Sequence, residues 1–187
     1  QKVDFLKKDS VERFLNWVSR QEKIDILVNN AGILFNSLFQ MTSESKLKEM
    51  FQINFFSHVH LTQLISREMV KNKKGNIIFI SSTSADGRDY GRFAYSSSKA
   101  AISSTARVLA SELGGRGVRV NSINPGLTNT DMMRKNTKEE NIKKELEKTS
   151  LNRVAEPIEI ANLAVFLGSD LSTYINGQNI RIDGGLQ

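Results

Sequence analysis

Short apolar segments of strand length alternate along this chain with longer segments that have helical periodicity. Ile24–Val28 and Ile77–Ile80 consist almost entirely of apolar residues, as is typical of strands buried on both faces of a parallel sheet. Two further strands are expected at 118–123 and 178–182. Helices are expected from about Asp9, at 43–71, at 92–113, from Thr137 to about Lys148 and from Pro157 onward. The alternation predicts an α/β fold, with helices on both faces of a doubly wound, mostly parallel sheet.

Polar residues and glycines directly follow three of the expected strands. They are Asn29–Gly32 after the first strand, Ser81–Ser82 after the second and Asn124–Gly126 after the third. In open sheets of parallel strands, ligands bind beyond the carboxyl ends of the strands. We therefore expect these three segments to meet at one ligand-binding edge.

Tyr95 and Lys99 stand four residues apart near the start of the helix expected at 92–113, so both side chains leave the same face. A free phenol has a pKa near ~10, which makes it a poor acid–base catalyst at neutral pH. A neighbouring ammonium group favours the phenolate and lowers that pKa. The pair is therefore a candidate acid–base centre, although a pair at this spacing, taken alone, is more often a surface contact.

Ser82 and Asn54 are two further polar residues in informative places. Ser82 follows a strand and precedes Tyr95 by thirteen residues, so its hydroxyl can hold a carbonyl oxygen beside the phenol. The alternative is a strand-ending serine that bonds to nearby backbone. Asn54 falls on the apolar stripe of its helix, where leucine is expected. A buried amide without partners costs about 1–3 kcal/mol, so Asn54 either serves the site or is satisfied by backbone or buried water.

Several motifs of the chain resemble those of the short-chain dehydrogenase/reductase family, in particular the 3-oxoacyl-[acyl-carrier-protein] reductases. Asn29–Gly32 is similar to the family's NNAG motif, and Tyr95–Lys99 to its YxxxK motif. Ser82 and Asn54 match the serine and asparagine of its catalytic tetrad. The remaining matches are to its PGxxxT segment and its C-terminal strand, at residues 125–130, 176–177 and 183–185. The resemblance implies a single Rossmann-type domain over residues 1–187.

This resemblance also implies an activity, a reversible hydride transfer between NAD or NADP and a carbonyl or secondary alcohol. Tyr95 would be the general acid/base, and Lys99 would lower its pKa and bind the nicotinamide ribose. Ser82 would orient the carbonyl, and Asn54 would hold a water that relays protons from Lys99. The implied cofactor-binding residues are Asp4, Phe5, Asn30, Ala31, Gly32, Tyr95, Lys99, Pro125, Gly126, Thr128 and Thr130.

The glycine-rich TGxxxGIG turn of the family, which binds the cofactor pyrophosphate at a helix N-terminus, has no counterpart in the sequence. Two βα units, about 60 residues in all, are therefore expected to be absent. Weak cofactor binding and an exposed sheet edge would follow. The residue that selects NAD or NADP would lie in that part. A non-catalytic binding or scaffold protein of the same fold is the alternative function.

Charge and composition limit the classes of partner and site that this chain is expected to have. The net charge is +6, but the lysines are mixed with acidic residues and lack interleaved aromatics, which favours a solvated basic surface over nucleic-acid binding. No segment is long and apolar enough for a membrane helix, and we expect no metal site. The chain has no cysteine, which excludes disulfides and thiolate catalysis and suits the cytoplasm.

Residues 128–150 are polar and rich in lysine and glutamate, as expected for a mobile lid over the substrate. Lid sequences say little about what they cover. An acyl-carrier-protein thioester is the first substrate hypothesis, because that carrier is acidic and this chain is basic. Sugars, steroids and small ketones stay open as alternatives.

Apolar residues off the core stripes of two helices predict a homo-oligomer, either a dimer or a tetramer of paired dimers. These residues are Ala101, Val108 and Ala110 in one helix and Phe55, Phe56 and Val59 in the other. The edge of the final strand near Arg181 is the expected second interface. The alternative is that the extra apolar residues pack under the absent N-terminal unit.

Overall fold

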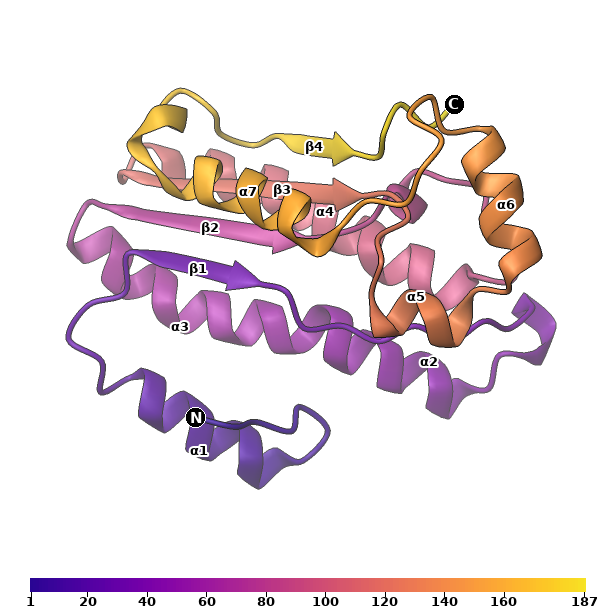
Figure 1. The fold of residues 1–187 in the computed structure, drawn as a ribbon. Helices are drawn as coiled ribbons and strands as arrows, with labels where there is room; N and C mark the ends of the chain where they lie inside the picture. The colour runs from indigo at the N-terminus through magenta and orange to yellow at the C-terminus, as the bar shows by residue number, and fades with distance from the viewer.

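Four parallel strands form one sheet in a computed structural model that describes residues 1–187. The strands are β1 (Ile26–Asn29), β2 (Gly75–Ile80), β3 (Val118–Pro125) and β4 (Asn179–Ile182). They lie in the order β1-β2-β3-β4, and each pair of neighbours is parallel. All four carboxyl ends therefore point to the same side of the molecule (Figure 1). The predicted α/β fold with a parallel sheet is confirmed.

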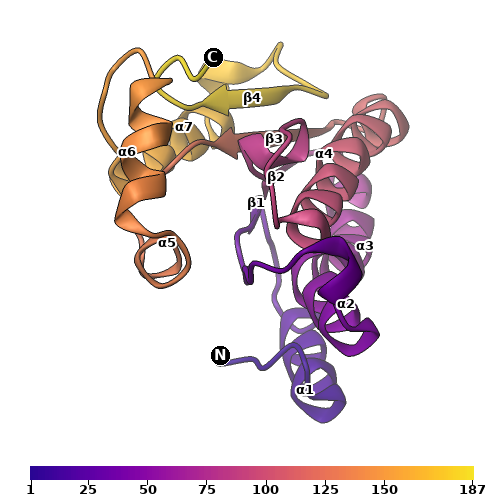
Figure 2. The same ribbon diagram turned by 90° about the vertical axis from the view of Figure 1, so that its right-hand side faces the viewer.

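Helices cover the two faces of this sheet (Figure 2). One layer contains α1 (Lys8–Val18), α2 (Glu44–Phe51), α3 (Ser57–Lys71) and α4 (Phe93–Gly114). The other contains α5 (Asp131–Asn136), α6 (Glu139–Glu147) and α7 (Pro157–Gly168). α7 packs on β2 and β3, whereas α5 and α6 stand beyond the carboxyl ends of the strands (Figure 1). Not one of these helices combines the length and the apolar character that a bilayer crossing requires.

The core has two sides, because successive side chains of a strand point to opposite faces of the sheet. Ile77 and Phe79 of β2 pack with α3 and α4 on one face. Ile78, the residue between them, packs with Ile123 of β3 and Leu167 of α7 on the other. All five side chains are fully buried. This packing holds the ends of β2 and β3 in place, and the residues that follow those ends form the candidate site.

β1 is less covered than the sequence predicts. Leu27 belongs to the core on the α3 side, but Ile26 and Val28, which point the other way, are 47% and 44% exposed. α7 contacts this face at its C-terminal end, where Gly168 lies against Ile26. The expectation that this strand is buried on both faces is therefore wrong. β1 also ends the sheet, so the expected exposed edge is present in this chain.

Helix boundaries agree with local signals where a cap is present. Pro157 is the first residue of α7, and Glu156 and Glu159 form a capping box in front of it. α1 differs from its prediction, because it begins at Lys8 without a side-chain cap, so Asp9 is not its N-cap. The sequence analysis predicts no helix at α5. Its six residues are too short to show helical periodicity, and its cap, Thr130, lies in a stretch expected to be irregular.

Candidate active site

The first half of α4 carries the two residues singled out by their spacing. Tyr95 and Lys99 lie one turn apart, and only 8% and 4% of their surfaces are exposed. α4 packs against β3 and against the short turn Thr83–Ala85 that follows β2. Both side chains are therefore held at the carboxyl edge of the sheet, so the pair is not a surface contact.

The Lys99 ammonium lies in a nearly closed environment. Its Nζ donates a hydrogen bond of 2.8 Å to the carbonyl oxygen of Ile80, the last residue of β2. Burial lowers the pKa of Lys99 to about 8. The same Nζ lies 5.8 Å from the centre of the Tyr95 ring. One hydrogen bond uses one of three ammonium hydrogens, so two stay free for other acceptors.

Tyr95 is protonated at neutral pH in this structure. Burial raises its pKa above the ordinary value, and the Ser82 hydroxyl and the charge of Arg92 oppose that shift, while Asp89 adds to it. Lys99 is not among the groups that change this pKa. The expected lowering of the Tyr95 pKa by Lys99 is therefore not found, and burial has the largest effect on this pKa.

Ser82 lies beside the phenol, at the point where the chain leaves β2. Its Oγ accepts a hydrogen bond of 3.1 Å from the backbone N–H of Ser84, and Ser82 caps the turn Thr83–Ala85. The structure thus shows the alternative role, that of a strand-ending serine bonded to nearby backbone. The two roles are compatible, because accepting a bond leaves the hydroxyl hydrogen free to donate.

Asn54 is fully buried in an irregular part of its helix. The helix predicted at 43–71 begins at Glu44 with Ser43 as its N-cap, but Gln52–Phe56 forms a π turn between α2 and α3. Such turns occur often at functional sites. Asn54 Oδ1 accepts from the N–H of Ile33 at 2.8 Å, and Nδ2 donates to the carbonyl of Ile33 and to Ser98 Oγ. Asn54 therefore joins the segment after β1 to α4 through paired backbone bonds.

Gly32 lies next to both Asn54 and Lys99. A Cβ atom at this position would lie 3.5 Å from Asn54 Oδ1 and 3.6 Å from Lys99 Nζ. The NNAG segment therefore reaches the same point as the residues from α2–α3 and α4. Asn30 is exposed on the outer side of that segment, and Ala31 and Gly32 are partly buried.

The segment after β3 is shaped by local contacts. A Cβ on Gly126 would come within 2.8 Å of Asp183 Cβ, so glycine is required for this close approach. Thr128 Oγ1 donates to the carbonyl of Gly126, and Thr130 Oγ1 accepts from the N–H of Met133 as the cap of α5. Thr130 thereby sets the direction in which α5 leaves the sheet.

Asp4 and Phe5 lie away from Tyr95, in the segment before α1. The Asp4 carboxylate accepts from the N–H of Leu6 and stands 3.7 Å from Lys7 Nζ, while the side chain stays exposed. The carbonyl of Phe5 accepts from Gln52 Nε2 of the π turn at 3.4 Å. The structure thus brings this segment to the π turn rather than to Tyr95.

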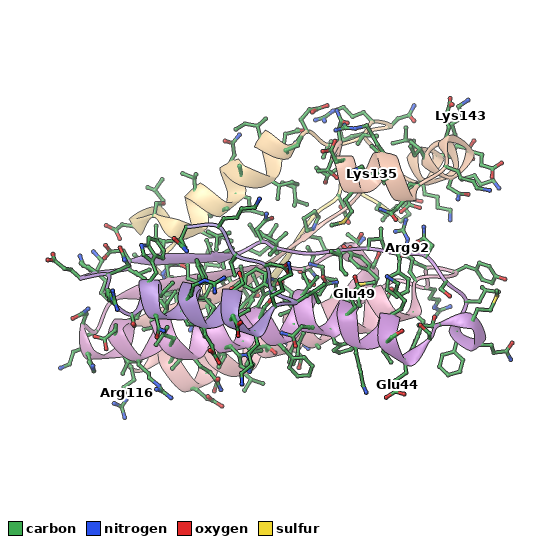
Figure 3. All side chains as sticks on the ribbon, turned by 90° about the horizontal axis from the view of Figure 1, so that it is seen from below. Glu44, Glu49, Arg92, Arg116, Lys135 and Lys143 are labelled. Atoms are coloured by element: carbon green, nitrogen blue, oxygen red, sulfur yellow. The ribbon has the colours of Figure 1, made fainter.

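Three polar residues near the site were missed by the sequence analysis. Arg92 and Asp89 form an ion pair of 3.6 Å next to Tyr95, and His58 lies one turn after Asn54, buried in α3. Figure 3 places Arg92 at the same end of the molecule as Glu49 of α2 and Lys135 of α5. His58 could have been found, because a histidine at this spacing from Asn54 also falls on the inner face of the helix.

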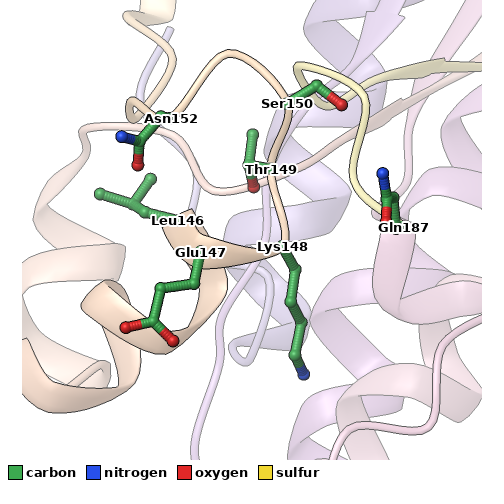
Figure 4. Close-up of a pocket in the computed structure, with 7 residues that line it drawn as sticks. All are labelled: Leu146, Glu147, Lys148, Thr149, Ser150, Asn152 and Gln187. Atoms are coloured by element: carbon green, nitrogen blue, oxygen red, sulfur yellow. The ribbon is translucent and has the colours of Figure 1, made fainter.

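A separate hollow of about 370 Å³ lies at the end of α6 and includes Gln187 at the C-terminus (Figure 4). Residues 146–150, Asn152 and Gln187 line it, and only one of these is hydrophobic. Small-molecule sites are mostly apolar with a few polar groups. Since the hollow is polar and contains none of the candidate residues, it is not the candidate active site.

Comparison with known proteins connects this geometry to a group of enzymes. A family model described as "Enoyl-(Acyl carrier protein) reductase" matches residues 1–187. The 7α-hydroxysteroid dehydrogenase of Escherichia coli K12 is 38% identical over 168 residues, which are 90% of this chain and 66% of that enzyme. The 3-oxoacyl-[acyl-carrier-protein] reductase FabG of Chlamydia trachomatis is 37% identical over 186 residues, 98% of this chain and 74% of the relative. The chain therefore spans about two thirds to three quarters of the length of these relatives.

Solved structures agree with these sequence matches. A 7α-hydroxysteroid dehydrogenase complexed with NADH and 7-oxo glycochenodeoxycholic acid superimposes with a TM-score of 0.92 at 35% identity, over 100% of this chain and 73% of that one. A gluconate 5-dehydrogenase from Burkholderia cenocepacia, in complex with NADP and tartrate, gives a TM-score of 0.91 at 25% identity, over 98% of this chain and 72% of that one. Both structures hold a nicotinamide cofactor.

Proposed function

This chain belongs to the short-chain dehydrogenase/reductase family, and we propose that the complete protein transfers a hydride between NAD or NADP and a carbonyl or secondary alcohol. The observation that carries the proposal is the buried pair Tyr95–Lys99, with Ser82 beside the phenol and Asn54 beside the ammonium. A scaffold protein needs no such pair. The relatives of this chain are named dehydrogenases and reductases, which also disfavours the non-catalytic alternative.

The residues at the carboxyl edge fit a nicotinamide cofactor. Lys99 has two ammonium hydrogens free, which suit the two hydroxyls of a ribose. The partly buried Gly32 and the exposed Asn30 offer a surface along the end of β1 for the adenosine side. Pro125, Gly126, Thr128 and Thr130, at the end of β3, are the proposed contacts of the nicotinamide end. Asp4 and Phe5 are the proposed contacts of the adenine.

The chain's own side chains would divide the acid–base work. The nicotinamide ring supplies or accepts the hydride. Tyr95, which is protonated at neutral pH, gives its proton to the carbonyl oxygen during reduction, and Ser82 donates a hydrogen bond that orients this oxygen. Lys99 holds the cofactor ribose and favours the phenolate once the proton has left. Asn54 Oδ1 has one lone pair left for a water beside Lys99, which can return a proton.

A 3-oxoacyl thioester is the proposed substrate class, and the cytoplasm is the proposed location. The net charge of +6 suits an acidic carrier protein, and one group of relatives is named for this substrate. The test is oxidation of NADH and NADPH by the complete protein with 3-oxoacyl thioesters, ethyl acetoacetate, 7-oxo bile acids and 5-ketogluconate. Turnover of any of them supports the oxidoreductase, and the ranking of kcat/KM tests the thioester. If the complete protein turns over none of these substrates, the non-catalytic scaffold function remains as the alternative.

Residues 128–150 are proposed to form a lid over the substrate. Neither α5 nor α6 contains a buried residue, and the carbonyl of Asn136 accepts a hydrogen bond of 2.6 Å from Asn36 Nδ2. We expect the amides of this segment to exchange with solvent faster than those of α4, because few apolar contacts hold it. Hydrogen–deuterium exchange on the complete protein checks this. Asn36→Ala should speed exchange in α5 further, and equal protection of α4 and α5 would contradict a lid.

A homo-oligomer, most simply a tetramer of paired dimers, is proposed from exposed apolar side chains. Val108 of α4 is 52% exposed and Phe56 of the π turn 44%, whereas Ala110 is buried and Phe55 packs against the core, so those two do not contribute. β4, at the other edge of the sheet, offers the second interface near the exposed Arg181. Light scattering should give a multiple of the monomer mass, and Val108→Glu should reduce it. A monomer at micromolar concentration would exclude this assembly.

A further inference from the structure

Two buried side chains behind the site have polar atoms to which no other side chain bonds. His58 of α3 is 2% exposed, the backbone of Ala31 approaches its ring, and no side chain bonds to either ring nitrogen. Asn29, the last residue of β1, is also 2% exposed, and its Oδ1 has no hydrogen-bond partner. Buried polar atoms are nearly always bonded to protein or to ordered water. An imidazole and an amide oxygen left unpaired in this way indicate water or a shared function.

The two side chains lie close together through Thr62. His58 and Thr62 are four residues apart on α3, so they stand on the same face of that helix. Asn29 Nδ2 donates a hydrogen bond of 2.9 Å to Thr62 Oγ1. The amide of Asn29 is thereby held against the stretch of helix that carries His58.

Lys99 borders this cluster. Asn29 pairs with Phe79 in the sheet, so it lies one residue from Ile80, whose carbonyl accepts from Lys99 Nζ. Ala31, whose backbone approaches the His58 ring, directly precedes Gly32, and Gly32 lies beside Lys99 Nζ. Burial lowers the pKa of His58 to about 4, and the positive charge of Lys99 adds to that effect. Lys99 is the only charged side chain with an influence on this pKa.

The hydrogen-bonding needs of these groups are complementary. A neutral imidazole has one N–H donor and one acceptor nitrogen. The ammonium of Lys99 has donors without acceptors, and Asn29 Oδ1 is an acceptor without a donor. Asn54 offers buried water only the second lone pair of its Oδ1, because its two Nδ2 hydrogens are already shared among Ile33, Met50 and Ser98.

We propose that His58 and Asn29 hold buried water beside Lys99, and that the His58 imidazole carries protons between the Lys99 ammonium and that water. The proposal rests on the proposed function and names a second positioning residue for the same site, separate from Asn54. In alcohol oxidation, the Tyr95 phenolate takes the hydroxyl proton. The acceptor nitrogen of His58 takes a proton from the Lys99 ammonium through buried water, while the other ring nitrogen releases one to water at Asn29. The Lys99 amine then takes the proton held by Tyr95, which restores both groups and leaves one proton in the water. Reduction runs the same transfers backward, so one proton from solvent replaces the one given to the substrate.

Kinetics of the complete protein with NADPH and ethyl acetoacetate test the relay. His58→Leu should lower kcat about tenfold, leave KM within twofold and raise the solvent deuterium isotope effect, because proton return becomes slower. His58→Gln, which keeps a donor and an acceptor, should recover most of the loss. His60→Leu, an exposed histidine two residues away, is the matched control and should match the wild type. Unchanged kcat in His58→Leu, or equal losses in the leucine and glutamine variants, would overturn the relay.

A structural measurement separates this proposal from the proposed function. A high-resolution crystal structure of the complete wild-type protein should contain ordered water within hydrogen-bond distance of His58 and of either Lys99 or Asn29. A dry cluster would overturn the relay even if the enzyme is active. Wild-type protein that turns over no ketone would instead count against the proposed oxidoreductase activity. The crystal structure would still show whether the cluster holds water, so the two failures can be told apart. The crystal structure also decides the matter if His58→Leu fails to fold.

Discussion

Tyr95→Phe in the complete protein is expected to lower kcat by about 100- to 10,000-fold, the usual effect of removing a general acid or base. The phenol is buried at the carboxyl edge of the sheet with the Ser82 hydroxyl next to it. Phenylalanine keeps the ring and its packing and removes only the oxygen. Substrate and cofactor should therefore still bind, and the loss should fall on kcat rather than on KM.

The matched control is Tyr90→Phe. Tyr90 lies five residues earlier and is 89% exposed, so losing its hydroxyl should change neither rate nor stability. Circular dichroism and the urea midpoint should be the same for both variants and the wild type. Tyr95→Phe activity within a few-fold of the wild type would remove Tyr95 from the mechanism.

The rate should also depend on pH in a direction set by the Tyr95 environment. Burial raises the pKa of this phenol, so it keeps its proton through neutral pH. Ketone reduction, which needs the acid form, should be nearly constant around pH 7. Alcohol oxidation, which needs the base form, should rise as the solution becomes alkaline.

Lys99→Met is expected to weaken two properties together. The cofactor should bind about 10- to 100-fold more weakly, because hydrogen bonds from a charged group are lost. The kcat should fall about 100-fold or more, because the buried positive charge proposed to stabilise the phenolate after proton transfer is then absent. Methionine keeps most of the apolar stem, so the packing should survive. Cofactor titration by fluorescence and steady-state kinetics measure the two effects separately, and Lys143→Met, at an exposed lysine of α6, is the control. Normal values for both would exclude Lys99 from the site.

The stability of Lys99→Met should differ from that of the wild type in a pH-dependent way. Burial lowers the pKa of Lys99 to about 8 in the folded chain, from an ordinary value of 10.5. Below pH 8 the buried charge destabilises the folded state in full, and the effect fades as the pH rises towards 10.5. We therefore expect the wild type to gain stability relative to Lys99→Met between these values. Urea unfolding at pH 7 and pH 9.5 measures the difference, and a constant difference would contradict the buried ammonium.

Local patterns in the sequence are sufficient to predict several features of this protein. The apolar segments around Ile77 and Val118 predict strands, because side-chain alternation and strand length are properties of neighbouring residues. The sequence also predicts that Tyr95 and Lys99 lie together, because side chains four residues apart share one face of a helix. The ligand-binding edge followed from parallel strand order, because the segments after parallel strands must meet at one side of the sheet.

Other features depended on segments that are distant in the sequence. The π turn around Asn54 forms where that amide bonds to the backbone of Ile33, and no local periodicity predicts this contact. The exposure of Val28 depends on which helix lies over β1, and the raised pKa of Tyr95 depends on all the atoms that bury it. Spacing places His58 on the inner face of its helix, but only the fold brings Asn29 and Lys99 near it. Spacing in the sequence determines which side chains share a face, but only tertiary packing determines which of them lose water, and desolvation sets their charge and pKa.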